Sequence, residues 1–231
     1  GVQTCALPIW QFGKYIAARV SVNFAQTGYT DQFNEYNPFL LRRNLSFFTN
    51  IYEATLQGDF NFFKFIPGDP DHLFTPYVTL GLGLFSYDPY AIYNGKKEYL
   101  RPLGTEGQNF SGGKKEYGTM ALCIPFGVGI KYNLTPRTNI SFEIAQRFTT
   151  TDYLDDVSTT YADKTALAAS HGDLAVILSD RSNDGQSLNN TNRQRGNAAD
   201  RDWYMFTGIT LNYTLTKKYS DNCTPFRSKL R

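Results

Sequence analysis

The stretch TMALCIPFGVGIKYN (119–133) decides the fold class, because every second residue in it is large and apolar. The residues between them are mostly small or polar, and period-two alternation puts the two sets on opposite faces of one β-strand. The turn sequence Thr135-Pro-Arg137 follows directly and leads into a second alternating segment over 139–148. Together these features predict an antiparallel hairpin.

Four further segments alternate in the same way, at 15–24, 52–62, 77–84 and 203–215. The chain therefore shows six predicted strands. Tight turns at 67–71 and 135–137 join two pairs of them, whereas the connections over 26–46, 88–116 and 152–202 are long. Helix-forming composition over 162–178, interrupted by Gly172, predicts a short helix in the longest connection.

Composition narrows the class of protein. The chain has 231 residues, a formal net charge of +2, 16% aromatic residues and 19% charged residues, below the roughly 25% typical of soluble domains. The small net charge argues against a nucleic-acid partner. The mean hydropathy is −0.40, and no apolar run is long enough for a membrane-spanning helix. These values do not exclude a membrane β-barrel, because its strands carry their apolar residues in alternation.

The polar face of the alternation decides between a membrane barrel and a soluble ligand-binding barrel. The solvent-exposed face of a soluble barrel should be rich in Lys and Glu. Here the polar face of the strands is mostly Gly, Ala, Ser, Thr and Asn. We therefore favour a transmembrane barrel with a polar lumen and an apolar outer face. Its lumen is predicted to hold a balanced charge network of Arg19, Glu53, Asp59, Lys131, Glu143 and Arg147. Aromatic residues near the strand ends predict interfacial girdles, formed by Phe60, Phe62, Tyr132, Phe148, Trp203 and Tyr213.

Outer-membrane barrels have short periplasmic turns and long external loops, which predicts the orientation and a periplasmic C-terminus. Residues 1–9 resemble a translated sequencing adapter, so we expect native sequence to begin near Trp10 after a missing first hairpin. We then expect one barrel domain over 10–216 and a periplasmic tail over 217–231. The segment Gly208–Tyr213 has the spacing of a C-terminal assembly signal, although the chain continues beyond it.

The sequence contains no set of residues that predicts an enzyme or a cofactor. His72 and His171 fall on opposite sides of the predicted membrane, so they are not expected to cooperate. The acidic run that contains Asp152, Asp155 and Asp156 is expected to be a solvated loop rather than a calcium site. The basic doublets 96–97 and 114–115 either contact lipopolysaccharide phosphates or form ordinary solvated surface.

Several stretches resemble one family: NLSFFTNIYE (44–53), FNFFKFIPG (60–68), YNGKK (93–97), RPLGTEGQ (101–108), TDYLDDVSTTY (151–161) and DWY (202–204). The chain resembles the PorG-like outer-membrane β-barrel components of the type IX secretion system of Bacteroidetes over roughly residues 14–223. The resemblance implies an eight-stranded barrel that associates with a periplasmic ring, which is formed by a lipoprotein and its partner. It also implies a role in protein export and, in gliding relatives, in surface motility.

The function expected from this resemblance is that of a non-enzymatic structural component. The alternatives are a small porin-like or adhesion barrel unrelated to secretion, and a barrel enzyme acting on lipids. Paired charges in the lumen argue against a wide pore, and the lack of a convergent Ser/His/Asp set argues against the enzyme.

Overall fold

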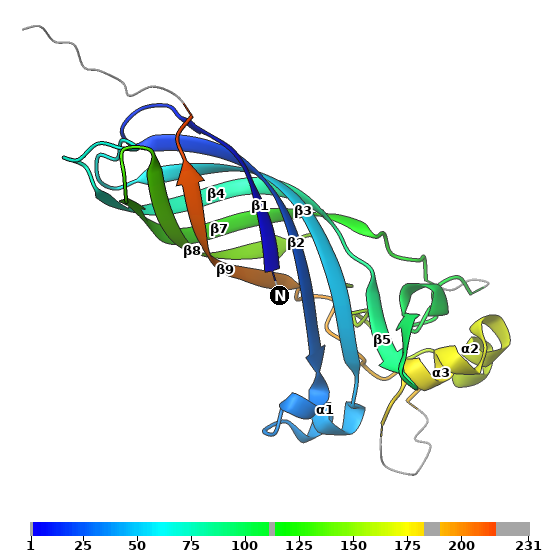
Figure 1. Cartoon of the computed structure of the whole chain (residues 1–231). Helices are drawn as coiled ribbons and strands as arrows, with labels where there is room; N and C mark the ends of the chain where they lie inside the picture. The colour runs from blue at the N-terminus through cyan, green and yellow to red at the C-terminus, as the bar shows by residue number, and fades with distance from the viewer. Residues whose placement is uncertain (1, 111–113, 183–189, 216–231) are drawn as a thin grey trace, which may run out of the picture.

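The computed structural model describes residues 2–110, 114–182 and 190–215, and its largest part is one curled antiparallel β-sheet (Figure 1). Seven strands follow one another in chain order across this sheet, each antiparallel to its neighbours. They are β1 (Val2–Gln11), β2 (Ile16–Thr30), β3 (Ser46–Asn61), β4 (Phe74–Ser86), β7 (Met120–Asn133), β8 (Thr138–Thr149) and β9 (Trp203–Tyr213). The antiparallel all-β architecture is confirmed, and all six predicted strands are present.

Strand β1 is the main difference from the predicted strand order. It covers residues that the sequence analysis sets aside as a non-native segment, and it pairs with β2 from Val2 opposite Ala25 to Gln11 opposite Ala17. Its register shifts between Ala6 and Ile9, around Pro8. Proline is tolerated at the edge of a sheet and at such irregularities.

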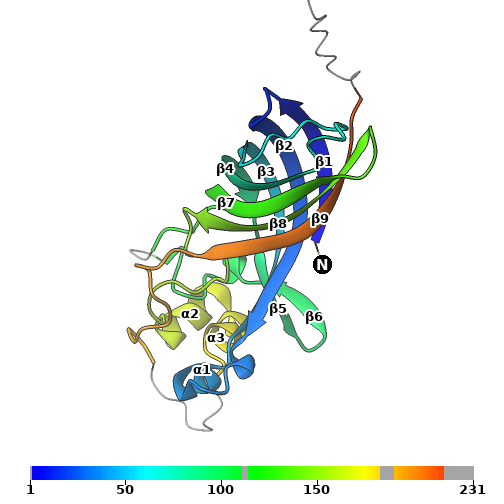
Figure 2. The same cartoon turned by 90° about the vertical axis from the view of Figure 1, so that its left-hand side faces the viewer.

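The sheet is open, so the expected closed barrel is not observed. Among the described residues, β1 pairs only with β2, and β9 pairs only with β8. Figures 1 and 2 show the sheet curling until these two edge strands approach each other. Because strand direction alternates through seven consecutive strands, β1 and β9 run the same way, and a direct antiparallel pairing between them is impossible.

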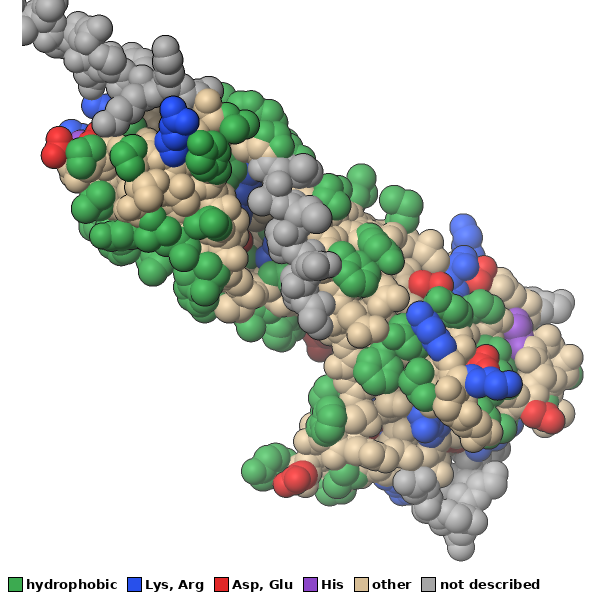
Figure 3. All heavy atoms as spheres, viewed as in Figure 1, with side chains coloured by type: hydrophobic (Ala, Val, Ile, Leu, Met, Phe, Trp, Pro, Cys, Tyr) green, Lys and Arg blue, Asp and Glu red, His purple; other side chains and the backbone are tan. Residues whose placement is uncertain are grey.

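The two faces of the sheet are inverted relative to those of a water-soluble protein. Large apolar side chains point outward and are exposed, as with Leu56 (60%), Leu82 (68%) and Val128 (56%). Polar side chains between them point inward and are buried, as with Gln57 (2%) and Thr79 (0%). Figure 3 shows hydrophobic side chains gathered over the strands, with most charged side chains in view on the two ends of the molecule. The assignment of the polar face to the interior is therefore correct.

Two inward glycines on β7 allow the interior to be filled by larger neighbours. A Cβ atom on Gly129 would lie 2.6 Å from Cε1 of the Tyr77 ring, and one on Gly127 would overlap Cβ of Ala145. The missing side chains thus leave room for the aromatic ring and for close packing of β8.

The three long connections fold together at one end of the sheet into a unit that we call the cap, which comprises the described residues of 31–45, 87–119 and 150–202. It contains α1 (Pro38–Arg43), the hairpin of β5 (Pro89–Tyr93) and β6 (Lys96–Tyr99), α2 (Lys164–His171), α3 (Asp173–Ser179) and two short 3-10 helices, Asp31–Phe33 and Arg101–Leu103 (Figure 2). β5 also pairs with β3, so it joins the cap to the sheet. The helix expected over 162–178 is present as two helices, which are separated by Gly172 with φ +81°.

The cap has an apolar core of its own. Ala91 from β5, Leu100 and Leu178 from α3 are buried together, and Phe47 from β3 packs against them. None of the helices in the described part of the chain combines the length and the apolar character that crossing a membrane would require.

Candidate functional site

The inward face of the sheet carries two groups of interacting charges, and the first lies toward the short turns. Arg19 on β2 donates to Glu143 on β8, and its Nε lies 3.5 Å from Oδ1 of Asp59 on β3. Nζ of Lys131 on β7 lies 2.8 Å from Oδ2 of the same Asp59. The hydroxyl of Tyr77 on β4 donates to Glu143 at 2.7 Å. Five neighbouring strands are thus linked through two positive side chains, two negative side chains and the hydroxyl of Tyr77.

The second group is centred on Glu53 of β3, which is 1% exposed. Its carboxylate accepts hydrogen bonds from Nδ2 of Asn23 at 2.6 Å, from the hydroxyl of Tyr204 at 2.7 Å and from Nε of Arg147 at 3.3 Å. The thiol of Cys123 donates to it at 3.7 Å. Arg147 also donates to the carbonyl of Ala145, so its buried guanidinium has partners on more than one side.

All six charged residues predicted for the lumen point inward, and each has an ion-pair partner within one of these two groups. Burying a single charge costs several kcal/mol unless an opposite charge and hydrogen bonds compensate it, and here three positive groups face three negative ones. Sequence reasoning missed the role of Tyr77 and Tyr204 as hydrogen-bond donors. Both residues alternate with apolar ones in their strands, so the parity of their positions already places them on the inward face.

The predicted girdle residues lie near the two ends of the outward apolar face. Phe148 on β8 pairs with Trp203 on β9 at the cap end. At the turn end, Phe60 and Phe62 meet edge to face with ring centroids 5.6 Å apart. The two remaining girdle residues, Tyr132 and Tyr213, also lie at the turn end, and all six are exposed.

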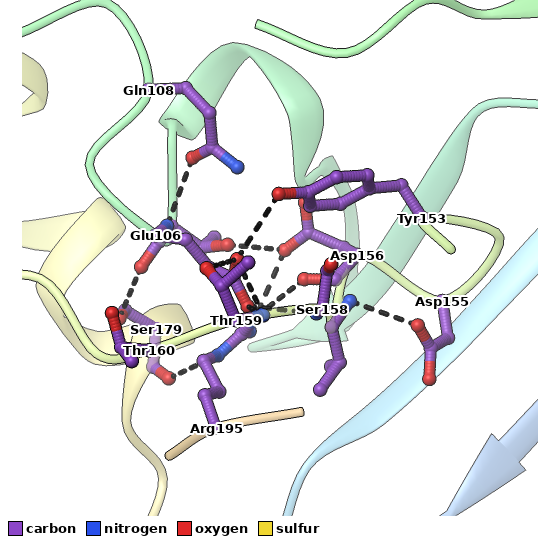
Figure 4. A network of polar contacts seen from close by, with 12 residues as sticks. Glu106, Gln108, Tyr153, Asp155, Asp156, Ser158, Thr159, Thr160, Ser179 and Arg195 are labelled. Carbon is purple, nitrogen blue, oxygen red and sulfur yellow. Dashed lines mark hydrogen bonds and ion pairs between the residues drawn. The ribbon is translucent and has the colours of Figure 1, made fainter. Parts of the chain in front are cut away.

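The cap is organised around Arg195, whose side chain is almost fully buried (Figure 4). Its guanidinium lies 3.2 Å from Glu106 and 3.5 Å from the carboxylate of Asp156, and it also donates to the carbonyls of Asp156 and Ser179. The backbone carbonyl of Arg195 in turn accepts from Arg43 at 2.8 Å. One arginine therefore joins the connections that follow β2, β4 and β8.

The two carboxylates bound to Arg195 have opposite pKa shifts. Burial alone would raise the pKa of Glu106, but the charge of Arg195 and hydrogen bonds from Ser158 and Thr159 outweigh it, so the pKa lies below its ordinary value. At Asp156, complete burial outweighs the charge of Arg195 and raises the pKa to about 6. The expectation of a solvated acidic loop is therefore wrong for Asp156, because the carboxylate is enclosed by the cap.

No local pattern marks Glu106 or Arg195 in the sequence, since 89 residues separate them and neither segment is periodic. His72 and His171 lie apart, in the turn before β4 and at the end of α2. The basic doublets belong to the cap, where Nζ of Lys97 lies 3.8 Å from the centre of the Tyr90 ring and Lys114 donates to Thr159.

Comparison with known proteins gives one family and no individual relative. No curated protein and no solved structure matches the chain. A family model described as "Domain of unknown function (DUF6089)" matches residues 9–175, which span β2 to β8 and much of the cap. The match covers more than half of the 231 residues, and the chain therefore belongs to the DUF6089 family.

Proposed function

We propose that this chain is an integral outer-membrane protein of the β-barrel type and that it acts as a non-enzymatic structural component. The observation that carries this proposal is the inverted sheet, whose outward face is continuously apolar and whose inward face holds the charges. Each large apolar side chain that moves from water into hydrocarbon stabilises the molecule by roughly 1.5–3 kcal/mol. A lipid bilayer is the environment that accommodates such a face on every strand of a curled sheet.

The positions of the outward aromatic residues support a bilayer location. The outward aromatic residues form one group near the turns and another near the cap, as is expected of residues at two membrane interfaces. In this orientation the turns around Asp71 lie on the periplasmic side and the cap lies outside the cell. Closure of the barrel needs one further antiparallel strand between β9 and β1, and this number agrees with the eight strands implied by the resemblance.

The paired charges support a structural role rather than a passive pore. The two groups around Glu53 and Asp59 connect opposite walls of the curled sheet through hydrogen-bonded side chains. A permeating solute would have to break these contacts. We infer that the interior stabilises the barrel, and that function resides on its two ends.

The role in type IX secretion rests on the sequence resemblance together with the proposed orientation. A component that associates with the periplasmic ring lipoprotein and its partner has two kinds of surface available there. These are the short turns and the tail over 217–231, which lies outside the described residues. Contacts with outer-membrane lipids and lipopolysaccharide would involve the apolar face and the basic side chains of the cap.

The membrane proposal is tested by labelling single cysteines in a cysteine-free background on intact cells. Tyr36, in the connection before α1, is 96% exposed, and a Tyr36→Cys variant should react with an impermeant maleimide. An Asp71→Cys variant should react only after the outer membrane is opened. Labelling of both sites on intact cells, or a protein that fractionates with the soluble proteins, would contradict the proposal.

The secretion role needs a separate measurement. Full-length protein should co-purify with ring components from detergent-solubilised outer membranes of its host, and deletion of residues 216–231 should reduce this co-purification without reducing membrane insertion. A barrel that inserts normally but never co-purifies with ring components would leave the membrane proposal intact. It would favour a porin-like or adhesion barrel instead.

A further inference from the structure

The hairpin of β5 and β6 extends the outward apolar face of the sheet. Phe48 lies on that face, as do the even-numbered residues that follow it on β3. It pairs with Tyr90 of β5, and residues paired across antiparallel strands lie on the same face. Tyr90 pairs in turn with Tyr99, and Ile92 pairs with Lys97. Phe48, Ile92 and Tyr99 are exposed, so Lys97 places a cation on an outward face that is otherwise apolar and aromatic.

A tight turn holds this hairpin in register. Asn94 and Gly95 connect β5 to β6 with φ of 49° and 75°, and a two-residue turn of type I′ requires positive φ at both positions. Asn and Gly adopt this conformation at little cost. Figure 2 shows the hairpin standing out from the side of the molecule, away from α2 and α3. The turn thus fixes Lys97 opposite Ile92 on a projecting element.

Two aromatic rings hold the ammonium group of Lys97. Its Nζ lies 3.8 Å from the centre of the Tyr90 ring and 4.7 Å from the centre of the Tyr99 ring. The Tyr90 ring is itself stacked against Phe48 at a centroid distance of 5.7 Å, and its hydroxyl accepts from Gln26 at 2.8 Å. A cation over a ring face is attracted by the π electrons, but its N–H groups stay available as hydrogen-bond donors. The rings therefore position the ammonium without satisfying its donors.

Lys97 lacks the close carboxylate that other basic side chains of the cap have. Nζ of Lys164, for example, lies 2.9 Å from Oδ2 of Asp180. In the described part of the chain, no Asp or Glu forms an ion pair with Lys97. The nearest acidic group that its charge affects is Asp88; burial raises the pKa of Asp88, and the charges of Arg101 and, more weakly, of Lys97 oppose this rise. Lys97 can therefore bind an external anion without breaking an ion pair.

The height of Lys97 on the molecule corresponds to the headgroup region of a bilayer in the proposed orientation. Phe60, near the turns, and Phe48 are twelve residues apart on β3. At about 3.3 Å per residue and a strand tilt of roughly 40°, they are separated by about 30 Å along the membrane normal, which is about the thickness of the hydrocarbon core. The outward face also becomes polar at this height, where Gln26 donates to Asn50 at 3.2 Å. The ammonium of Lys97 thus lies at the depth of the lipid phosphates.

We propose that Lys97, positioned by Tyr90 and Tyr99, binds the phosphate group of a lipid headgroup at the external face of the membrane. Phosphate is the anionic group that lipids present at this depth, and a Lys ammonium binds it as a point charge. The inference rests on the proposed membrane location, and it assigns the lipid contact to one of the two basic doublets. Lys114, in the other doublet, donates instead to Thr159 of the cap.

The test uses the full chain reconstituted into phosphatidylcholine vesicles, with one tryptophan as the reporter. Both native tryptophans are replaced by Phe, and Ile92→Trp places the reporter opposite Lys97. Lipids brominated near the headgroup quench a tryptophan that they contact, so quenching by brominated phosphatidic acid and by brominated phosphatidylcholine is compared at equal mole fractions. The reporter should show about fivefold higher affinity for phosphatidic acid, since a basic residue at an anionic lipid surface contributes about 1 kcal/mol. Lys97→Gln should remove this preference, and Lys97→Arg should keep it.

The matched control is Lys115→Gln, which removes the same charge from another exposed residue of the cap and should leave the preference unchanged. An equal loss in this control, or an unchanged preference in Lys97→Gln, would overturn the proposal. A second reporter, Leu82→Trp on the outward face of β4, separates this inference from the membrane location. Quenching of the Leu82→Trp reporter but not of the Ile92→Trp reporter would refute the lipid contact at Lys97 and leave the membrane location standing, whereas quenching of neither would refute both. The heat-modifiable band on gels checks that each variant is folded.

Discussion

The Glu53–Arg147 pair offers the sharpest test of the interior. The carboxylate of Glu53 is buried and accepts hydrogen bonds from Asn23, Tyr204 and Arg147 at 2.6, 2.7 and 3.3 Å. Glu53→Met would remove this acceptor and leave the guanidinium of Arg147, which is itself 3% exposed, without a counter-charge. Removal of one partner from a buried pair costs about 3–5 kcal/mol, so the free energy of unfolding should fall by that amount.

The double variant distinguishes an ion pair from simple loss of packing. In Glu53→Met with Arg147→Met, no charge is left uncompensated, and replacement of a buried pair by apolar residues is often close to neutral. The combined loss should therefore be much smaller than the sum of the two single losses. Equilibrium urea unfolding of the protein in lipid vesicles, followed by tryptophan fluorescence and by the heat-modifiable band, measures these free energies.

The control for this cycle is Glu35→Met, because Glu35 is an exposed residue of the cap. It should change the free energy of unfolding by less than about 0.5 kcal/mol, as is usual for surface positions. If both single variants at the pair unfold like the control, or if their losses add in the double variant, the interior is not held by this pair. The argument for a sealed, structural lumen would then fail.

Three further predictions concern the cap and the glycines. Arg195→Met leaves Asp156 buried without a cation and leaves Glu106 with Lys114 alone, whose Nζ lies 3.9 Å away, so limited proteolysis should cleave the cap much faster while the strands stay protected. Unchanged cleavage would refute the central role of Arg195. The folded protein holds a proton at Asp156 up to about pH 6, whereas an unfolded Asp loses it near pH 4. Resistance of the cap to proteolysis should therefore fall as the pH rises from about 4 to 6 and stay lower above that. The variant Asp156→Asn should remove this part of the pH profile. Gly129→Val should sharply lower the folded fraction on gels, because its Cβ would meet the Tyr77 ring, whereas Gly208→Val, whose Cβ has open space, should fold normally; equal yields of the two variants would disprove the packing argument.

The sequence alone determined the strand class and the two faces of the sheet. Alternation is a local property, because successive side chains of a strand point to opposite sides whatever the strand pairs with. The segment that contains Val128 and Lys131 therefore revealed its outward and inward sides without knowledge of its neighbours. The balance of the six inward charges followed from the same parity.

The pairing of the inward charges was decided only by the tertiary structure. The contacts of Lys131 with Asp59 and of Arg147 with Glu53 join residues that are 72 and 94 positions apart. Such contacts depend on the register between strands and on the curvature of the sheet, and both are fixed by hydrogen bonding along the whole ladder. Strand β1 was not predicted because residues 1–9 were expected to be a non-native segment, and its pairing with β2 is visible only in the tertiary structure.

The cap shows the limit of sequence reasoning most clearly. Its connecting segments carry no period, so composition indicated little beyond the helix that Gly172 divides into two. Burial of Asp156 and the central position of Arg195 arise because three segments distant in the chain pack on one another. Alternation is encoded residue by residue, whereas enclosure depends on how the whole chain is arranged.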